Sequence, residues 1–169
     1  MQIPSHLVIF AQMKVTLLCV GKTDVPWVRD GLELYASRLG HYVPFAVVEL
    51  PALKNAASLT REQVKEKEGE MVLRGLKPSD CVILLDERGK EYRSVEFASR
   101  LQELLSRSGR DLVFVIGGAY GFNEAVYARG EMMMSLSRMT FSHQMVRTIF
   151  AEQLYRAFTI LKGEPYHHE

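Results

Sequence analysis

FVIGGAYGF, residues 114–122, begins as an apolar run and then breaks into two adjacent glycines, with a third three residues further on. A short, continuously apolar run bounded by glycines is typical of a strand that is buried on both faces. Glycine turns also let a phosphate, a nucleotide or another small cofactor approach the backbone. The glycine offsets do not fit the GxGxxG fingerprint, and no GK[ST] follows as in a P-loop. Alone, the stretch predicts a buried strand and a strand-to-helix turn, and it leaves the ligand open.

Strands and helices alternate along the chain on both sides of this stretch. Apolar, partly β-branched runs predict strands at 14–20, 44–50, 81–86, 112–116 and 132–139. Start and stop signals enclose helices between 24 and 40, 60 and 73, 94 and 109, 122 and 130, and 142 and 162. This order predicts a single-domain α/β fold with a parallel sheet covered by helices on both faces. Ligands of such sheets bind beyond the carboxyl ends of the strands, here after Leu85, Ile116 and Met139.

The sequence also predicts how two helices begin and which side of two helices is buried. Thr60 and Gln63 have the form of a capping box, and Ser94 is expected to cap the helix that follows it. Helical spacing predicts an apolar side in the first helix, made of Trp27, Val28, Leu32, Tyr35 and Leu39, and in the last, made of Met145, Ile149, Phe150, Leu154 and Phe158.

Composition limits the class of protein. Of 169 residues, 47% are hydrophobic and 24% are charged, with a formal net charge of +1, as in an ordinary globular domain. A protein that holds nucleic acid through many sequence-blind phosphate contacts is usually more basic. An RNA partner would therefore have to be held by shape or by a local patch.

Cysteines, histidines and the N-terminus give no sign of a metal, a disulfide or a membrane. Cys19 and Cys81 lie in apolar runs, as buried reduced thiols do, and the adjacent His167 and His168 lack further metal ligands. Residues 1–12 do not make a signal peptide, and no run is long enough to cross a bilayer. We expect a cytoplasmic, metal-free protein with its domain at 13–169 and an N-terminal extension, or a start-site artefact, at 1–12.

The last predicted helix concentrates polar chemistry. On it, His143 and Arg147 share one face at i, i+4, and Glu152 and Arg156 share another. His143 is either a functional residue or a capping or core histidine. Glu152 and Arg156 either act in chemistry or form a helix ion pair of roughly 0.2–0.5 kcal/mol.

Blocks distributed along the chain carry a family resemblance: KVTLLCVGK, KEKEGE, FVIGGAYG, SLSRMTFSHQMVR, EQLYRAF and GEPYHHE, in that order. Over residues 13–169 they resemble the bacterial ribosomal large-subunit pseudouridine N3-methyltransferase family of the SPOUT class. The resemblance implies a C-terminal trefoil knot, which no general rule predicts because knots are nearly absent from proteins. It also implies S-adenosyl-L-methionine as cofactor, a homodimer, and as substrate a pseudouridine of large-subunit ribosomal RNA (23S rRNA) in the assembled ribosome.

Carried over by motif, the resemblance assigns cofactor-binding residues to three segments. They are Leu85, Gly117, and Leu136, Ser137, Arg138, Met139, Thr140 and Phe141. The glycines would then leave room for the cofactor. Two positions depart from the family pattern: Tyr120, where relatives often have a small or acidic residue, and Ser142, where proline is common. An acidic role at 120 is not transferred, whereas Ser142 remains suited to a helix start.

Catalytic roles follow from the implied reaction, in which N3 of the base must lose a proton. His143 or Glu152 would accept the proton, and Arg156 would stabilise the charge on the flanking carbonyl oxygens. Tyr166 and His167 suit stacking and hydrogen bonding to a base, and the tail of the second subunit would deliver these groups. Alternatively, Glu152 and Arg156 only pair, within the chain or across the dimer.

Other expectations concern the RNA and rival functions. Arg129, Arg138 and Arg147 are candidates for a local basic rim. One rival is a non-catalytic ribosome-associated binding protein that keeps the fold. The other is a flavodoxin-like or nucleotide-binding domain, which the strand–helix order alone would also allow.

Overall fold

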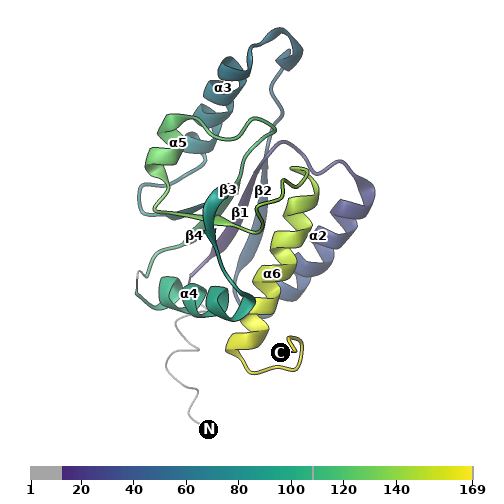
Figure 1. Cartoon of the computed structure of the whole chain (residues 1–169), viewed down its shortest axis with the longest axis vertical. Coiled ribbons are helices and arrows are strands. Elements are labelled where there is room, and N and C mark those ends of the chain that lie inside the picture. Colours follow the sequence, from purple (N-terminus) through teal and green to yellow (C-terminus); the bar gives the residue numbers. More distant parts are fainter. Residues whose placement is uncertain (1–12, 108, 169) are drawn as a thin grey trace.

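The predicted strand at 112–116 is β4 (Leu112–Ile116), and each of its residues is buried. The computed structural model describes residues 13–107 and 109–168, so the extension expected at 1–12 lies outside the described residues. β4 pairs in parallel with β1 (Val15–Val20) and with β3 (Cys81–Glu91). β2 (Phe45–Leu50) adds to β1 and β5 (Met132–Ser135) adds to β3, which gives the parallel order β2-β1-β4-β3-β5. The predicted parallel α/β sheet is confirmed (Figure 1).

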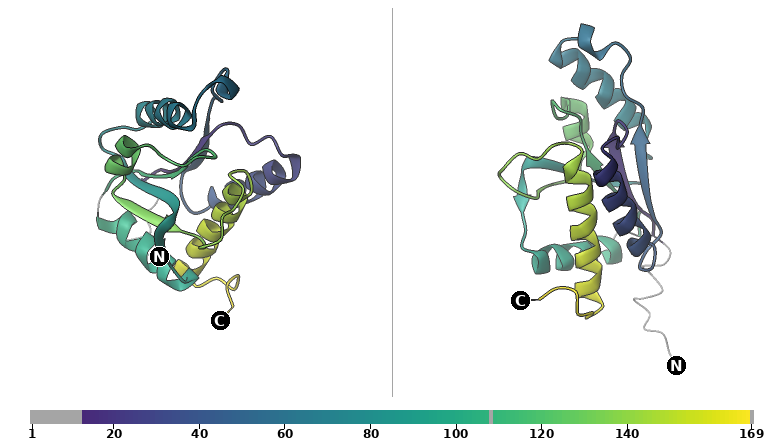
Figure 2. Two further views of the ribbon diagram at one scale, coloured as in Figure 1. Left: turned by 45° about the horizontal axis from the view of Figure 1, so that its top comes forward. Right: turned by 90° about the vertical axis from the view of Figure 1, so that its right-hand side faces the viewer.

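Helices cover both faces of this sheet, as Figures 1 and 2 show. They are α2 (Pro26–Leu39), α3 (Arg61–Arg74), α4 (Ser94–Arg107), α5 (Glu124–Arg129) and α6 (Met145–Leu161), with a 3-10 helix η1 at Ala56–Ser58. Side chains alternate along each strand, so Leu17 joins the core with α2, α4 and α6, while Leu18 joins the core with α3 and α5. The continuous apolar runs of the strands follow from this double burial.

Helix α3 begins with the predicted capping box. Thr60 Oγ1 accepts a hydrogen bond from the Gln63 backbone N–H at 3.2 Å, and Gln63 Oε1 accepts one from the Thr60 N–H at 2.9 Å. With η1, α3 stands out beyond the rest of the fold (Figures 1 and 2). It therefore forms a wall on one side of the carboxyl edge of the sheet.

Several predicted details are wrong. β5 ends at Ser135 instead of 139, so 136–144 is a loop, and β3 continues to Glu91 instead of 86. Ser94 is the first residue of α4 and not its cap; its hydroxyl donates to Gln153 Oε1 at 3.3 Å.

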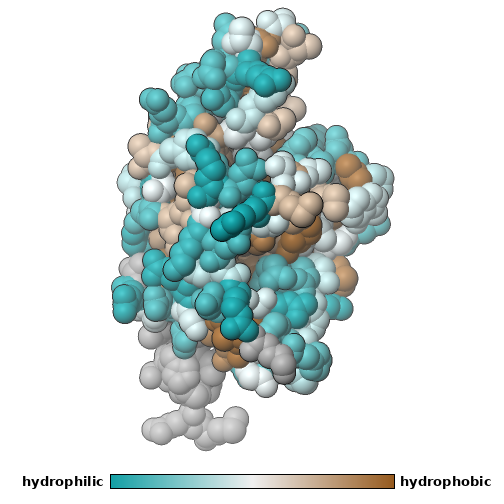
Figure 3. Space-filling model, viewed as in Figure 1, coloured by the Kyte–Doolittle hydropathy of each residue, from teal (hydrophilic) through white to brown (hydrophobic). Residues whose placement is uncertain are grey.

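Two apolar side chains assigned to buried helix faces are exposed. Trp27 is 60% exposed and Met145 39% exposed. Both lie in the first turn of a helix, and periodicity predicts the face of a residue but not whether a neighbour covers that end. Figure 3 shows a mostly hydrophilic surface on this side of the molecule, with some hydrophobic side chains gathered beside α6.

The join between β3 and β5 is irregular. Met134 pairs with Leu85 and again with Lys90, so residues 86–89 bulge out between the two pairings. Gly89 lies so close to β5 that a Cβ there would sit 2.6 Å from the backbone N and C of Met134. Only glycine fits at this crossing.

Candidate functional site

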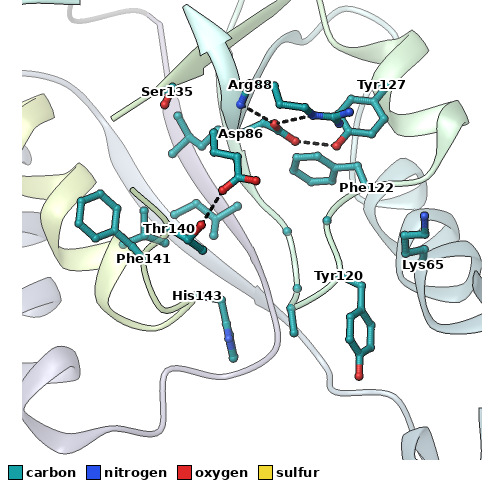
Figure 4. A pocket seen from close by; sticks show the side chains of 18 of the residues that line it. Lys65, Asp86, Arg88, Tyr120, Phe122, Tyr127, Ser135, Thr140, Phe141 and His143 are labelled. Atoms are coloured by element: carbon teal, nitrogen blue, oxygen red, sulfur yellow. Dashed lines mark hydrogen bonds and ion pairs between the residues drawn. The ribbon is translucent and has the colours of Figure 1, made fainter. Parts of the chain in front are cut away.

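A cavity of about 1160 Å³ lies beyond the carboxyl ends of β3, β4 and β5, bounded on one side by α3 (Figure 4). Segments after Leu85 and Ile116 and the loop after Ser135 line it. Parallel strands carry these segments to one edge, where a ligand site is expected in such a sheet. The volume is somewhat above the range of about 300–1,000 Å³ that is typical of ligand pockets, so there is room for more than one small ligand.

Most of the cofactor residues inferred from the sequence meet in this cavity. Its lining includes Leu85, Gly117, Leu136, Ser137, Met139, Thr140 and Phe141, and also His143. Arg138 is not among the lining residues. Its side chain is 91% exposed, with Nε 3.3 Å from Glu91 Oε1.

Hydroxyl groups hold the loop from Ser135 to the start of α6. Ser137 N–H donates to Ser135 Oγ at 3.2 Å. Thr140 Oγ1 donates to Glu87 Oε2 at 2.7 Å, which ties the loop to the bulge of β3 (Figure 4). Ser142 Oγ accepts from the N–H groups of Gln144 at 3.1 Å and Met145 at 3.3 Å. Ser142 thus accepts hydrogen bonds from backbone amides at the start of α6, one turn before the regular helix. This is the helix-start role that was expected of it.

The glycines at the end of β4 lie close to neighbouring side chains. A Cβ at Gly117 would lie 3.0 Å from the Phe122 ring, and one at Gly118 would lie 2.4 Å from Glu68 Oε2. The expectation that these glycines also leave room for a cofactor stays a prediction. They let Phe122 and α3 pack closely against the strand end, and this packing shapes the cavity wall.

A network that the sequence did not suggest braces the bulge of β3 at residues 86–89. Tyr127 OH donates to Asp86 Oδ2 at 2.6 Å, and Arg88 donates to Asp86 Oδ1 through its backbone N–H at 2.9 Å and Nε at 3.2 Å. The Arg88 guanidinium lies 4.8 Å from the centre of the Tyr127 ring (Figure 4). Burial alone would raise the pKa of Asp86, but these hydrogen bonds outweigh it and the pKa is lowered. Asp86 is thus a fixed anion in the cavity wall.

Arg147 is buried completely, with no exposed side-chain surface. NH2 donates to Val20 O at 2.8 Å, NH1 to Gly21 O at 2.9 Å and to Thr23 Oγ1 at 2.8 Å, and Nε to His143 O at 3.0 Å. Arg147 therefore does not share an open face with His143. It clamps the His143 turn onto the loop after β1, while the His143 side chain lies exposed in the cavity.

The other predicted catalytic residues form a separate cluster at the far end of α6. Arg156 NH2 and Tyr166 OH both donate to Glu152 Oε1, at 2.6 and 2.9 Å. Arg156 NH1 lies 3.2 Å from His167 Nδ1, and the guanidinium lies 4.8 Å from the Tyr166 ring centre. Burial and hydrogen bonds with Tyr35 and Glu152 raise the pKa of Tyr166. None of the four lines the cavity.

The description "Predicted SPOUT methyltransferase" belongs to a family model that matches residues 13–167. The chain belongs to this SPOUT family. A protein of Parabacteroides distasonis called ribosomal RNA large subunit methyltransferase H is 50% identical over 157 residues, which are 93% of this chain and 100% of the relative. Proteins of the same name from Bacteroides fragilis and Porphyromonas gingivalis are each 52% identical over the same shares.

Solved structures resemble this SPOUT chain at low identity. A probable methyltransferase from Bordetella pertussis has a TM-score of 0.53 and 10% identity, with 91% of this chain and 98% of that chain covered. A methylase family protein from Neisseria gonorrhoeae has a TM-score of 0.50 and 10% identity, with 99% and 89% covered. At such identity the likeness shows the fold alone.

The basic rim expected on this SPOUT domain is not formed by the three predicted arginines. Arg147 is buried, and Arg129 donates to Lys77 O and Asp80 O, just before β3 begins and so at the end of the sheet away from the cavity. Of the three, only Arg138 is exposed near the cavity loop. The sequence did not predict where these arginines lie, because each of them interacts with residues that are distant in the sequence.

Within residues 13–107 and 109–168, no three His, Cys, Asp or Glu side chains are grouped so that they could hold a metal ion. In the same part of the chain, no helix has the length and apolar character needed to cross a membrane.

Proposed function

We propose that this chain transfers the methyl group of S-adenosyl-L-methionine to N3 of a pseudouridine in large-subunit ribosomal RNA. The substrate would be the assembled ribosome in the cytoplasm, and the active form a homodimer. Family membership and the shared name of relatives about 50% identical over their full length support the reaction class. The observation that carries the proposal is the meeting of three strand-end segments, after Leu85, Ile116 and Ser135, around one cavity.

The lining suits the chemistry of this cofactor. Leu85, Ile116 and Leu136 offer an apolar wall for a planar adenine, whereas Asp86 and Glu87 place carboxylates beside it, as a sulfonium cation would favour. Leu85, Gly117 and the loop 136–141 would hold the cofactor. When bound, it would supply a methyl group already activated by the positive sulfur. The protein then has to align the acceptor base and take the N3 proton.

His143 is the better candidate for the proton acceptor. Its side chain is exposed in the cavity, and Arg147 fixes its backbone carbonyl. Both oxygens of Glu152 already accept hydrogen bonds, Oε1 from Arg156 and Tyr166 and Oε2 from Gln153 at 2.8 Å. Glu152 would therefore orient Arg156, and the guanidinium would stabilise negative charge that develops on the base.

A second copy is needed if the cavity and the tail cluster serve one reaction. From residue 143 to residue 156 the chain advances roughly 20 Å, at 1.5 Å per residue, along α6 and the turn that precedes it. The C-terminal tail folds back against the far end of α6 (Figure 1), where Tyr166 donates to Glu152. A partner related by a two-fold axis would bring its own Arg156 and Tyr166 to this cavity. The exposed Met139, Phe141 and Met145 beside the cavity offer apolar surface for such contact.

We also infer that the C-terminal part is threaded as a knot. The double pairing of Met134 with Leu85 and Lys90, and the tight crossing at Gly89, support a chain that wraps closely around β5. Threading would fix the loop 136–141 against the ends of β3 and β4 without any disulfide or metal.

The reaction is tested by incubating the purified protein and cofactor with ribosomes from a strain lacking the modification, followed by mass spectrometry of the RNA. His143→Ala should slow methylation by about 10²–10⁴-fold, with cofactor affinity unchanged by calorimetry. Arg74→Ala, on α3 outside the cavity lining, is the matched surface control. Cofactor binding without methylation of any ribosome would indicate the non-catalytic binding protein instead. Equal methylation of naked RNA would refute the assembled ribosome as substrate.

The shared site is tested by co-expressing His143→Ala and Arg156→Ala chains. If each site takes His143 from one subunit and Arg156 from its partner, mixed dimers keep one intact site, and about a quarter of wild-type activity returns. If both residues act within one chain, no mixed dimer has an intact site and activity stays absent.

A further inference from the structure

Tyr120 stands at the tip of the glycine turn that follows β4. Gly121 N–H donates to Gly118 O at 3.2 Å, and φ of Gly121 is +81°, so residues 119 and 120 form the tip of a tight turn. The Tyr120 side chain is 48% exposed although it lines the cavity. A rigid turn therefore holds a large aromatic ring at the mouth of the site.

Arg61 backs this ring from another part of the fold. It is the first residue of α3, lies on the cavity rim, and its guanidinium carbon is 5.3 Å from the centre of the Tyr120 ring. The capping box at Thr60 and Gln63 fixes the start of the helix, and thus the backbone from which Arg61 extends. The pair is a preformed aromatic–guanidinium unit that is open to solvent.

The charges on the α3 side of the cavity rim argue against a surface that binds RNA through its phosphates. On α3 the basic Arg61 and Lys65 alternate with the acidic Glu62 and Glu66, and Lys65 is paired with Glu62 at 3.0 Å. Attraction to the RNA backbone is therefore partly cancelled here. A stacking surface does not depend on net charge, because every base has a π-face.

In Figure 4, the side chains of Tyr120 and His143 lie on either side of the glycine turn and extend in the same direction. The apolar wall of Leu85 and Ile116 lies deeper, at the strand ends. A base stacked on Tyr120 would thus lie at the mouth, across the glycine turn from the residue proposed to take the proton.

We propose that Tyr120, backed by Arg61, is a stacking platform for an unpaired base of the substrate RNA next to the target nucleotide. This inference rests on the proposed function. It assigns Tyr120 to RNA rather than to the cofactor, because the ring lies at the open rim. Aromatic side chains and arginine planes are the usual partners of splayed bases in RNA recognition.

The test measures binding of large ribosomal subunits by sedimentation, apart from methyl transfer, together with cofactor affinity by calorimetry. Tyr120→Ala should weaken subunit binding at least about 5-fold and leave cofactor affinity within about 2-fold. Tyr120→Phe keeps the ring and should bind like wild type, whereas Tyr120→Leu keeps bulk without a π-face and should behave like Tyr120→Ala. Unchanged subunit binding of Tyr120→Ala, or a parallel loss of cofactor affinity, would overturn the platform.

A pair of arginine variants separates the platform from general charge. Arg61→Ala should weaken subunit binding, whereas Arg74→Ala, an exposed arginine on the same helix, should not. Equal losses for both would refute the role of Arg61. The Tyr120→Ala defect should also persist between about 50 and about 200 mM salt, because stacking releases no counterions. If wild type binds subunits but never methylates them, the proposed enzyme function fails while the platform still stands.

Discussion

Replacing the buried Arg147 by methionine should destabilise the protein strongly and disorder the His143 turn. Methionine fills much of the same volume but supplies no donor. Three carbonyl groups, those of Val20, Gly21 and His143, would lose a charged hydrogen-bond partner. Thr23 Oγ1 would lose one as well, and the Glu49 carboxylate, 3.5 Å from NH1, would lose its cation.

The magnitude follows from burial. Removing one partner of a buried ion pair costs about 3–5 kcal/mol, because the remaining groups stay desolvated. Glu49 is 35% exposed, so water will compensate the carboxylate in part, and we expect a loss of about 3–4 kcal/mol. For a chain of this length that lowers the melting temperature by about 10 °C.

Urea and thermal unfolding followed by circular dichroism measure this change. Arg138→Met makes the same substitution at an arginine whose side chain is 91% exposed, and it should stay within about 0.5 kcal/mol of wild type. Adding Glu49→Gln to Arg147→Met should restore part of the stability, since the unpaired charge is removed. An Arg147→Met protein as stable as Arg138→Met would refute the reasoning that a buried guanidinium holds these loops.

Other substitutions and conditions test the remaining contacts. Gly89→Ala should cost at least about 1–3 kcal/mol in thermal unfolding, because its Cβ would meet the Met134 backbone at 2.6 Å; normal stability would contradict the close crossing. Burial raises the pKa of the Cys19 thiol to about 12, so it should resist iodoacetamide at pH 8 in the native protein and react in urea; rapid native labelling would contradict this. Because the pKa of Asp86 is lowered on folding, its contribution to stability is present above about pH 4 and is lost as pH falls through the folded value. Tyr127→Phe should therefore lower the unfolding free energy at pH 7 by about 1 kcal/mol, with the difference shrinking in acid; a pH-independent difference would argue against the hydrogen bond.

Local signals in the sequence were enough to predict much of the fold. β4 has the predicted bounds because an unbroken apolar run ending in glycine is the pattern of a strand buried on both sides. The capping box of α3 involves two residues only three positions apart, so their residue types are enough to predict it. After Ser135 the apolar residues wrongly predict that the strand continues. Hydroxyl groups of Ser135, Ser137 and Thr140 take over the hydrogen bonding, and the strand ends before Met139.

The hydrophobic periodicity of the sequence could not predict interactions between residues that are far apart along the chain. Arg147 bonds to Val20, and Tyr127 to Asp86, so neither the buried clamp nor the fixed anion has a local signature. The general rule for parallel sheets predicted the regions after Leu85 and Ile116, whereas the individual cofactor residues were inferred from the family resemblance. Helical spacing put His143 and Arg147 on one face, whereas His143 precedes the regular helix and Arg147 turns into the core.

The contact between α6 and α2 has a consequence for how the protein is made. β1 lies between β2 and β4, and α2 packs against α6, so the earliest elements complete their core with the latest. Such sequence-distant contacts slow folding, and synthesis at about 5–20 residues per second adds a further wait. Until α6 has left the exit tunnel, the apolar face that includes Leu17 and Phe114 is covered only in part, by α2 and α4. Nascent chains that stall before Met145 should therefore remain protease-sensitive clients of chaperones, and the fold should close only once α6 has emerged.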